Sequence, residues 1–158
     1  MKRSGWSTNT APPGIERRRA ASYLSGMPSW DDVARICLAL PQTSEVASSE
    51  GRRQWRVRDK LFTWERGLRL KDLEELGESA PTGPVLGARV PDDGAKLALI
   101  ADEPEVYFTT SHFDGYPAVL CRLDALTDQA LVELVEEAWA CRAPRRLLAE
   151  HPIGSRRP

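Results

Sequence analysis

The chain has 158 residues and a formal net charge of −1, and 41% of its residues are hydrophobic. A chain of this length is expected to form one domain with a substantial core, since about 70% of the unfolded surface is buried at this size. No segment approaches the roughly 18 consecutive apolar residues of a membrane-spanning helix, and the start lacks an apolar secretory core, so we expect a cytoplasmic protein.

The charges are distributed unevenly along the chain. Residues 1–28 contain five Lys and Arg residues and one Glu, whereas residues 29–148 contain 15 Lys and Arg residues against 21 Asp and Glu residues. The predicted domain, residues 29–148, is therefore acidic. It lacks the broadly basic surface that is typical of nucleic-acid-binding proteins.

Both ends of the chain are polar. Residues 1–28 are rich in Ser, Thr, Pro, Gly and Arg and have few large apolar side chains, so burial cannot offset the entropy that is lost on ordering. We expect a flexible basic tail there, although the composition also fits a targeting peptide and Met27 also fits a misassigned start. Residues 149–158 are predicted to form a flexible C-terminal tail.

The first predicted helix begins after Ser29. Ser29 is expected to be the N-cap and Asp32 its capping-box partner. Apolar residues recur at helical spacing from Val33 to Leu40, and Pro41 ends the helix. A single apolar stripe indicates that this helix packs on a sheet.

A hairpin is predicted after a polar loop. Residues 54–58 and residues 61–65 each alternate in polarity, which predicts two strands. In the second strand, Phe62 and Trp64 are expected to share one face. The connection is predicted at residues 59–60.

The remaining predicted elements complete an α+β order. They are a short helical piece within residues 68–77, a strand near 85–90, a helix capped by Asp92 or Asp93, strands at 106–109 and 117–123, and a last helix that begins at the N-cap Thr127 and is ended by Pro144. In the helix after Asp93, Leu97, Ile100 and Ala101 are expected to face inward. The order α-β-β-β-α-β-β-α, with helices between antiparallel strand groups, predicts a two-layer α+β domain.

The sequence offers no recognisable catalytic or metal-binding pattern. Cys37, Cys121 and Cys141 form neither a CxxC motif nor a metal-ligand spacing, and their apolar neighbours predict reduced, buried thiols. There is no glycine-rich phosphate loop and no Ser or Cys nucleophile motif. We therefore expect a non-enzymatic protein without a cofactor or a metal ion.

Basic residues gather in and just before the predicted hairpin. They are Arg52, Arg53, Arg56, Arg58 and Lys60. Because alternate strand residues share a face, Arg56 and Arg58 would lie about 7 Å apart and could contact phosphates of DNA. The alternative is a solvated strand face that pairs with neighbouring acidic residues. Arg145 and Arg146, after the last helix, form a second candidate edge for nucleic acid.

The connection between the last two predicted strands is both polar and aromatic. It contains His112, Phe113 and Tyr116, and His112 is the only histidine outside the C-terminal tail. Gly115 suits a turn with positive φ and Pro117 suits the start of a strand, so a structural loop explains these residues. The alternative is the rim of a small-molecule-binding site formed by the three side chains.

Four stretches resemble the MmcQ/YjbR family of small bacterial proteins. They are SWDDVARICLALP at 29–41, VRDKLF at 57–62, EVYFTTSHFDGYPAVLCRL at 105–123 and AWACRAPRRL at 138–147. The resemblance implies an antiparallel five-stranded sheet with helices packed on one face, in the secretion-chaperone-like class. It also implies DNA binding, because members of the family are described as DNA-binding proteins with a double-wing arrangement.

Three hypotheses of different classes follow. The first is DNA binding through the basic hairpin and the edge at Arg145 and Arg146, with an affinity that falls steeply with salt. The second is a protein-interaction module that uses an exposed sheet face or edge to bind a partner or to form a homodimer. The third is a small-molecule-binding protein with a pocket at His112, Phe113 and Tyr116, which a flat surface there would contradict.

Overall fold

The computed structural model describes residues 27–153, which contain five α-helices, three short 3-10 helices and six strands. The helices are α3 (Trp30–Leu38), α4 (Leu70–Leu76), α5 (Asp93–Asp102), α6 (Asp128–Arg142) and α7 (Arg145–Glu150). The strands are β1 (Thr43–Ala47), β2 (Arg53–Val57), β3 (Lys60–Arg66), β4 (Val85–Arg89), β5 (Tyr107–Phe108) and β6 (Ala118–Arg122). Most of the predicted N-terminal tail and the end of the predicted C-terminal tail lie outside the described residues.

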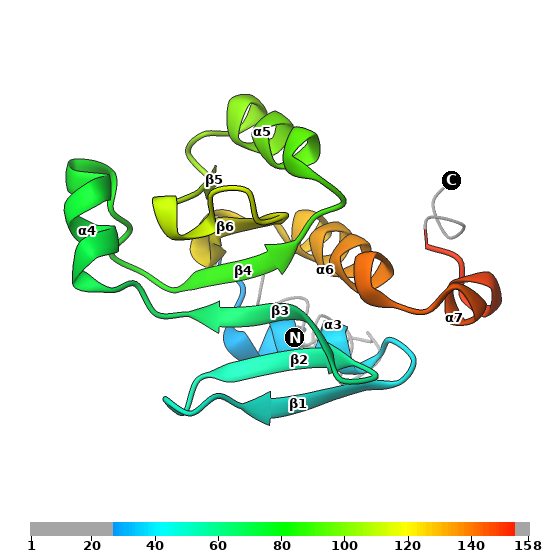
Figure 1. The fold of residues 1–158 in the computed structure, drawn as a ribbon. Helices are drawn as coiled ribbons and strands as arrows, with labels where there is room; N and C mark the ends of the chain where they lie inside the picture. Colours follow the sequence, from blue (N-terminus) through cyan, green and yellow to red (C-terminus); the bar gives the residue numbers. More distant parts are fainter. Residues whose placement is uncertain (1–26, 154–158) are drawn as a thin grey trace, which may run out of the picture.

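The strands form one antiparallel sheet in the order β1-β2-β3-β4-β6-β5. Helices α3 and α6 pack against one face of this sheet (Figure 1). The predicted α+β class with an antiparallel sheet is confirmed, but the sheet has six strands rather than five. The additional strand is β1, for which the sequence predicts a loop, because an edge strand with mostly exposed residues shows no alternation in polarity.

The main core lies between the sheet and helices α3 and α6. Trp55 of β2, Phe62 of β3, and Leu131 and Trp139 of α6 are fully buried there. Burial of a large apolar side chain stabilises a fold by about 2–3 kcal/mol. The indole N–H of Trp139 donates to the carbonyl oxygen of Pro41 at 3.1 Å, so its polar atom is satisfied as well.

The predicted N-caps are confirmed, and of the two candidates for α5 it is Asp92 whose carboxylate accepts the N–H of Ala95, at 2.8 Å. The Ser29 hydroxyl accepts the N–H of Asp32, and the Asp32 carboxylate accepts the N–H of Ser29 at 2.8 Å, which completes the capping box. The Thr127 hydroxyl accepts the N–H of Ala130 at 3.0 Å. After α6 the chain forms α7, which crosses the domain boundary predicted at residue 148.

The β2–β3 hairpin turns one residue earlier than predicted. Its two turn residues are Arg58 and Asp59, both with positive φ (48° and 72°), and Lys60 already belongs to β3. Positive φ at both central positions is typical of a type I′ turn, which matches the twist of the flanking strands. The connection predicted at residues 59–60 is therefore wrong.

A β-bulge in β3 places two aromatic residues on different faces. Residues 55 and 56 pair with Thr63 and Leu61, which leaves Phe62 as the additional residue between them. The bulge shifts the alternation, so Phe62 lies in the main core whereas Trp64 lies on the opposite face of the sheet. The prediction that Phe62 and Trp64 share a face is therefore wrong.

The second face of the sheet is covered only in part. A smaller apolar cluster that includes Trp64, Phe108 and Phe113 lies there, and Leu76 at the end of α4 packs against it. Trp64 lies directly on Gly87 of β4, where a Cβ atom would collide with the indole ring. Beside β1 and β2 this face remains open in the described part of the chain, because α3 packs on the other side.

Helix α5 buries a charged residue in place of a leucine. Ile100 packs on the core as predicted, but Leu97 is 62% exposed and Ala101 is exposed too. Lys96 is the buried residue of this helix, at 3% exposure. The prediction for Leu97 and Ala101 is wrong because Lys96 finds hydrogen-bond acceptors in the loop between β5 and β6.

Candidate ligand-binding groove

A cavity of about 630 Å³ opens on the second face of the sheet. It lies between the segment that leads into β2, strand β3 and the loop of residues 111–116, which we call the β5–β6 loop. His112, Phe113 and Tyr116, the residues of the predicted small-molecule site, line it together with Arg52 of the predicted nucleic-acid site. The fold thus joins two predicted sites in one cavity, which we call the groove.

The β5–β6 loop forms one wall of the groove and is held from two sides. Nζ of Lys96 in α5 donates to the carbonyl oxygens of Phe113 (2.6 Å) and Tyr116 (3.0 Å). The Glu75 carboxylate of α4 accepts hydrogen bonds from the N–H and the hydroxyl of Ser111, each at 2.9 Å. The backbone of the loop is therefore fixed, and the side chains that it carries have defined positions.

Sequence reasoning missed both anchors of the loop. For Lys96 the sequence does contain a signal. Lys96 is a lone lysine in an apolar helical stretch, and it lies on the same side of the helix as Leu99. If that side is buried, the lysine must find a polar partner. Glu75 gave no signal, because it is one of several acidic residues on a short helix. Only the fold shows that Ser111 lies beside it.

Aromatic rings form the floor of the groove. The ring of Phe113 lies 6.2 Å from that of Trp64 and 6.1 Å from that of Tyr116. The guanidinium groups of Arg66 and Arg89 lie over Phe113 and Tyr116, at 5.0 Å and 4.7 Å. Tyr116 is 41% exposed and is the most accessible of the three rings.

Arg66 lines the groove and forms a buried ion pair with Asp72 of α4. Nη2 lies 2.9 Å from Oδ2, and the two side chains are 11% and 6% exposed. Burial opposes ionisation of Asp72, but the hydrogen bond from the N–H of Arg69 and the charge of Arg66 outweigh it and lower the pKa of the carboxyl group. Nε of Arg66 is also buried, and it has no acceptor among the described residues.

Arg52 also lines the groove, as Arg66 and Arg69 do, and it is held loosely. Its Nε lies 3.8 Å from Glu50 and its Nη1 lies 3.8 Å from Glu65, distances too long for hydrogen bonds. Its Nε is buried and finds no acceptor within residues 27–153. The guanidinium rests on Gly67, where a Cβ atom would collide with it. Because an unpaired buried donor is costly, an oxygen acceptor from a ligand would stabilise this arrangement.

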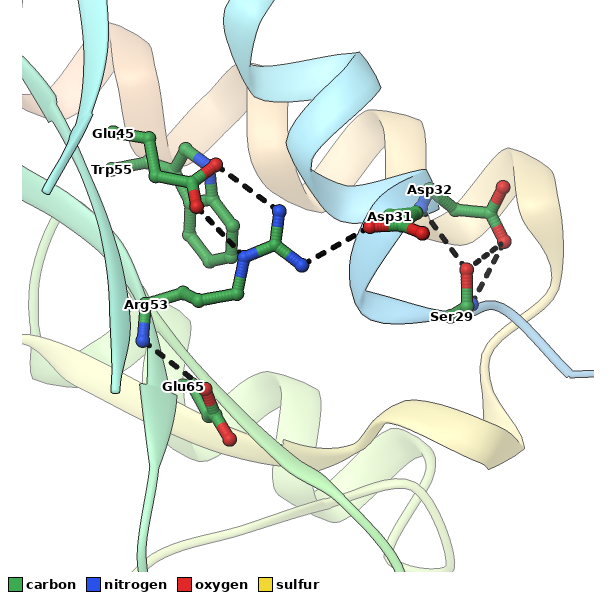
Figure 2. A network of polar contacts seen from close by, with 7 residues as sticks. All are labelled: Ser29, Asp31, Asp32, Glu45, Arg53, Trp55 and Glu65. Atoms are coloured by element: carbon green, nitrogen blue, oxygen red, sulfur yellow. Dashed lines mark hydrogen bonds and ion pairs between the residues drawn. The ribbon is translucent and has the colours of Figure 1, made fainter. Parts of the chain in front are cut away.

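Arg53 lies on the helix-covered face of the sheet, away from the groove. Figure 2 shows its guanidinium between Glu45 of β1 and Asp31 of α3, at 2.8 Å and 3.2 Å. The hydrogen bond from Arg53 lowers the pKa of Glu45, which also accepts the indole N–H of Trp55 at 3.0 Å. Arg53 thus connects α3 to two strands, and its donors are already engaged.

Arg56 and Arg58 do not follow one another on a single strand face. Arg56 lies on the open face and donates to the Gln54 side chain (3.0 Å) and to the Asp59 carbonyl oxygen (3.1 Å). Arg58 is a turn residue with a left-handed backbone conformation. The prediction that Arg56 and Arg58 lie in a row on one strand face is therefore wrong, because the turn begins one residue earlier than the alternation in polarity predicts.

Four of the predicted basic residues are exposed and form no ion pair in the described part of the chain. They are Arg58, Lys60, Arg145 and Arg146. The hairpin turn contacts the connection between α3 and β1, because the N–H of Arg58 donates to the carbonyl oxygen of Gln42 at 3.1 Å. Pro41 of the same connection accepts from Trp139 near the end of α6. The turn and α7 accordingly lie toward the same end of the molecule, on the right in Figure 1.

The described residues contain no group of three or more His, Cys, Asp or Glu that could hold a metal ion. The three cysteines are free, and Cys37 and Cys121 are fully buried as predicted, whereas Cys141 is half-buried. Burial raises the pKa of each thiol. No helix between residues 27 and 153 is long and apolar enough to cross a membrane.

Fold and groove together define a class of protein: a small α+β domain with helices on one face of an antiparallel sheet and a ligand-sized cavity on the other. The model of the YjbR family matches residues 38–141. The chain belongs to this family, as the sequence resemblance implies.

Relatives and a solved structure agree with this assignment. The uncharacterised proteins Rv2570 of Mycobacterium tuberculosis (strain ATCC 25618 / H37Rv) and Mb2600 of Mycobacterium bovis are each 54% identical over 125 residues, which cover 77% of this chain and 94% of each relative. The crystal structure of Deinococcus radiodurans protein DR2400, with its DUF419 domain, matches with a TM-score of 0.57 and 15% identity over 79% of this chain and 88% of that chain. At this identity the similarity shows the fold alone.

Proposed function

We propose that this protein is a non-enzymatic binding protein whose ligand is a small molecule with a flat ring and an anionic group. The observation that supports this most directly is the groove, a cavity of about 630 Å³ that brings aromatic side chains together with two incompletely paired arginines. Small-molecule sites in proteins commonly have volumes of about 300–1,000 Å³ and a few polar groups among apolar ones. A flat surface at the β5–β6 loop would have argued against this function.

The two parts of the ligand meet different residues. A flat ring would pack against the accessible ring of Tyr116 and the apolar floor that Phe113 forms. A carboxylate or phosphate oxygen would accept from Arg52, whose present contacts to Glu50 and Glu65 are long. Charge-assisted hydrogen bonds of this kind are short and strong, so they would outcompete the long ion pairs.

The test is a calorimetric titration of the full chain with 1-naphthoate and with the neutral, equally large 1-naphthalenemethanol. We predict that naphthoate binds at least tenfold more tightly, which corresponds to about 1.4 kcal/mol. Arg52→Gln should remove most of this difference, because it takes away the positive charge that faces the carboxylate. Arg146→Gln on the exposed surface of α7 is the matched control and should leave both affinities unchanged. Equal affinity for the two probes in the unmodified protein would refute the proposal.

DNA binding is the second candidate function, and one observation favours it. Arg58, Lys60, Arg145 and Arg146 are exposed, form no ion pair within the described residues, and lie toward one end of the molecule. Free lysine and arginine side chains can contact phosphates without reading the base sequence. The acidic remainder of the domain limits such a surface to this end.

This second candidate predicts a specific salt dependence. In fluorescence-anisotropy titrations with a short DNA duplex, affinity should fall steeply with salt. The double variant Arg58→Ala/Lys60→Ala should reduce the slope of log K against log salt by about 1 for each phosphate that the protein no longer neutralises. Arg53→Ala is not a suitable comparison because it breaks the α3–β1 network, so Arg52→Gln serves as the control and should leave the slope unchanged. Undetectable or salt-independent binding would exclude this function.

A further inference from the structure

A second cavity of about 590 Å³ lies on the helix-covered side of the sheet, between α5 and α6. Ala95 and Leu99 of α5 and Leu134 of α6 form its apolar walls, and Tyr107 of β5 lies at its base. Tyr107 belongs to the main core beneath α6, whereas Trp64 of the groove belongs to the cluster on the opposite face. The α5–α6 cleft and the groove are therefore separate sites.

The α5–α6 cleft is strongly acidic. Four carboxylates line it: Asp102, Glu103, Glu133 and Glu137. None of them forms an ion pair within residues 27–153, and Glu133 is engaged only by the side-chain amide of Gln129 at 2.8 Å. The one cation in the lining is Arg89, and its guanidinium lies over the ring of Tyr116 at 4.7 Å. The four carboxylates thus outnumber the single arginine of the lining, so the cleft has an excess of negative charge.

Tyr107 provides an independent indication of a ligand. The residue is only 6% exposed and lines the cleft. Its hydroxyl forms no hydrogen bond to another side chain or to the backbone within residues 27–153. Burial, then the Cys121 thiol and the carboxylates of Glu103, Glu133 and Glu137, raise the pKa of Tyr107 to about 12. The side chain is therefore a neutral phenol at physiological pH. The hydroxyl is not one of the fully buried atoms without a partner, so it is accessible from the cleft. A ligand with an N–H donor would find an acceptor there.

We propose that the α5–α6 cleft binds a small organic cation, an amine or guanidinium group on an apolar body. The cation would lie among the carboxylates and the Tyr107 hydroxyl, and the apolar body would lie between Leu99 and Leu134. Apolar walls on both helices favour an organic cation over a bare metal ion, and the described residues contain no metal-holding group. The negative charge excludes nucleic acid from this cleft. The proposal does not depend on the groove, which lies on the other side of the sheet and has the opposite preference in charge.

The test uses the full chain and three probes of matched shape: 4-phenylbutylamine, 4-phenylbutan-1-ol and 4-phenylbutanoate. In calorimetric titrations at low salt, the amine should bind at least tenfold more tightly than the alcohol, and the carboxylate should bind more weakly than both. The preference for the amine should shrink as salt is raised, because added ions screen the carboxylates. Equal binding of the three probes, or no binding of the amine, would overturn the proposal.

Variants assign the binding to this cleft. The double variant Glu133→Gln/Glu137→Gln should weaken amine binding at least tenfold, and Tyr107→Phe should weaken it by a few fold. If the double variant does not fold, Asp102→Asn on the exposed end of α5 tests the same charge and should give a smaller loss.

Glu74→Gln on α4 is the matched control. Arg52→Gln should have no effect on amine binding, because Arg52 lines the groove and not the α5–α6 cleft. The two proposed sites can therefore be tested independently. An unchanged amine affinity in both the Glu133/Glu137 and the Asp102 variants would place the ligand elsewhere and overturn the proposal.

Discussion

Lys96 is the residue that connects helix α5 to the wall of the groove. Its Nζ is buried and donates to two backbone carbonyl oxygens of the β5–β6 loop, those of Phe113 and Tyr116. Hydrogen bonds from a charged donor contribute about 1.5–3 kcal/mol each. One side chain therefore helps to stabilise the fold and also positions the rings that a ligand would contact.

Replacement of Lys96 tests this double role. Lys96→Met keeps much of the side-chain volume but leaves both carbonyl oxygens without their donor, so we predict a loss of about 3 kcal/mol in the free energy of unfolding. Amide hydrogen exchange at Gly115 and Tyr116 should accelerate, because the loop loses one of its two anchors. Lys71→Met, on the exposed surface of α4, should change neither quantity. Unchanged exchange in Lys96→Met would show that the loop does not depend on this anchor.

The sequence predicts some residues of the groove but not others. The sequence predicts His112, Phe113 and Tyr116 as a possible site, since the loop combines aromatic residues with the only histidine outside the C-terminal tail. The groove lies against all three residues. The sequence did not single out Arg66, since nothing in its neighbourhood indicates that β3 carries it to the same cavity. Contacts between residues that are far apart in the sequence depend on how the elements pack, so they leave no pattern in the local sequence.

At the scale of elements, helix α4 joins the groove to the sheet through the Arg66–Asp72 ion pair. Removal of one member of a buried ion pair leaves the other charge without compensation, which costs about 3–5 kcal/mol. The lowered pKa of Asp72 means that the ionised carboxylate stabilises the folded state above the unfolded pKa of about 4, and that this contribution is lost as the pH falls through the folded value.

The acid sensitivity of the fold follows from this linkage. We predict that urea-unfolding free energies are nearly constant from pH 7 to 5 and decrease below about pH 4. Asp72→Asn should lower the stability at pH 7 by about 3 kcal/mol and should make the decrease below pH 4 shallower, whereas Glu74→Gln on the same helix should do neither. A parallel pH dependence in Asp72→Asn and the unmodified protein would contradict the assignment to Asp72.

Local interactions of the elements can be predicted from the sequence, whereas two features of the strands β1 and β3 cannot. The caps at Ser29 and Thr127 were predicted correctly because capping is a local interaction. The bulge at Phe62 was not, because an additional residue in β3 is defined only relative to its partner strand. Strand β1 was missed for a related reason: its residues are exposed on both faces, so its place in the sheet rests on pairing with β2.

At the scale of the whole molecule, the two faces of the sheet have different chemistry. The open face carries the groove with its arginines and aromatic rings, and the helix-covered side carries the acidic α5–α6 cleft. The net charge of −1 conceals this separation. The α+β class and the family followed from the order of elements and the matching stretches, but which basic residues share a surface depended on the turn, the bulge and the packing of α3.

The most direct test of the central claim, that the groove is the ligand-binding site, is the mapping of 1-naphthoate on the full chain by two-dimensional ¹H–¹⁵N NMR. We predict saturable shifts of the Trp64 indole N–H and of the backbone amides of Gly115 and Tyr116, and little change at the hairpin turn or in α7. Shifts confined to the hairpin turn, to the α5–α6 cleft or to no residue at all would contradict the claim.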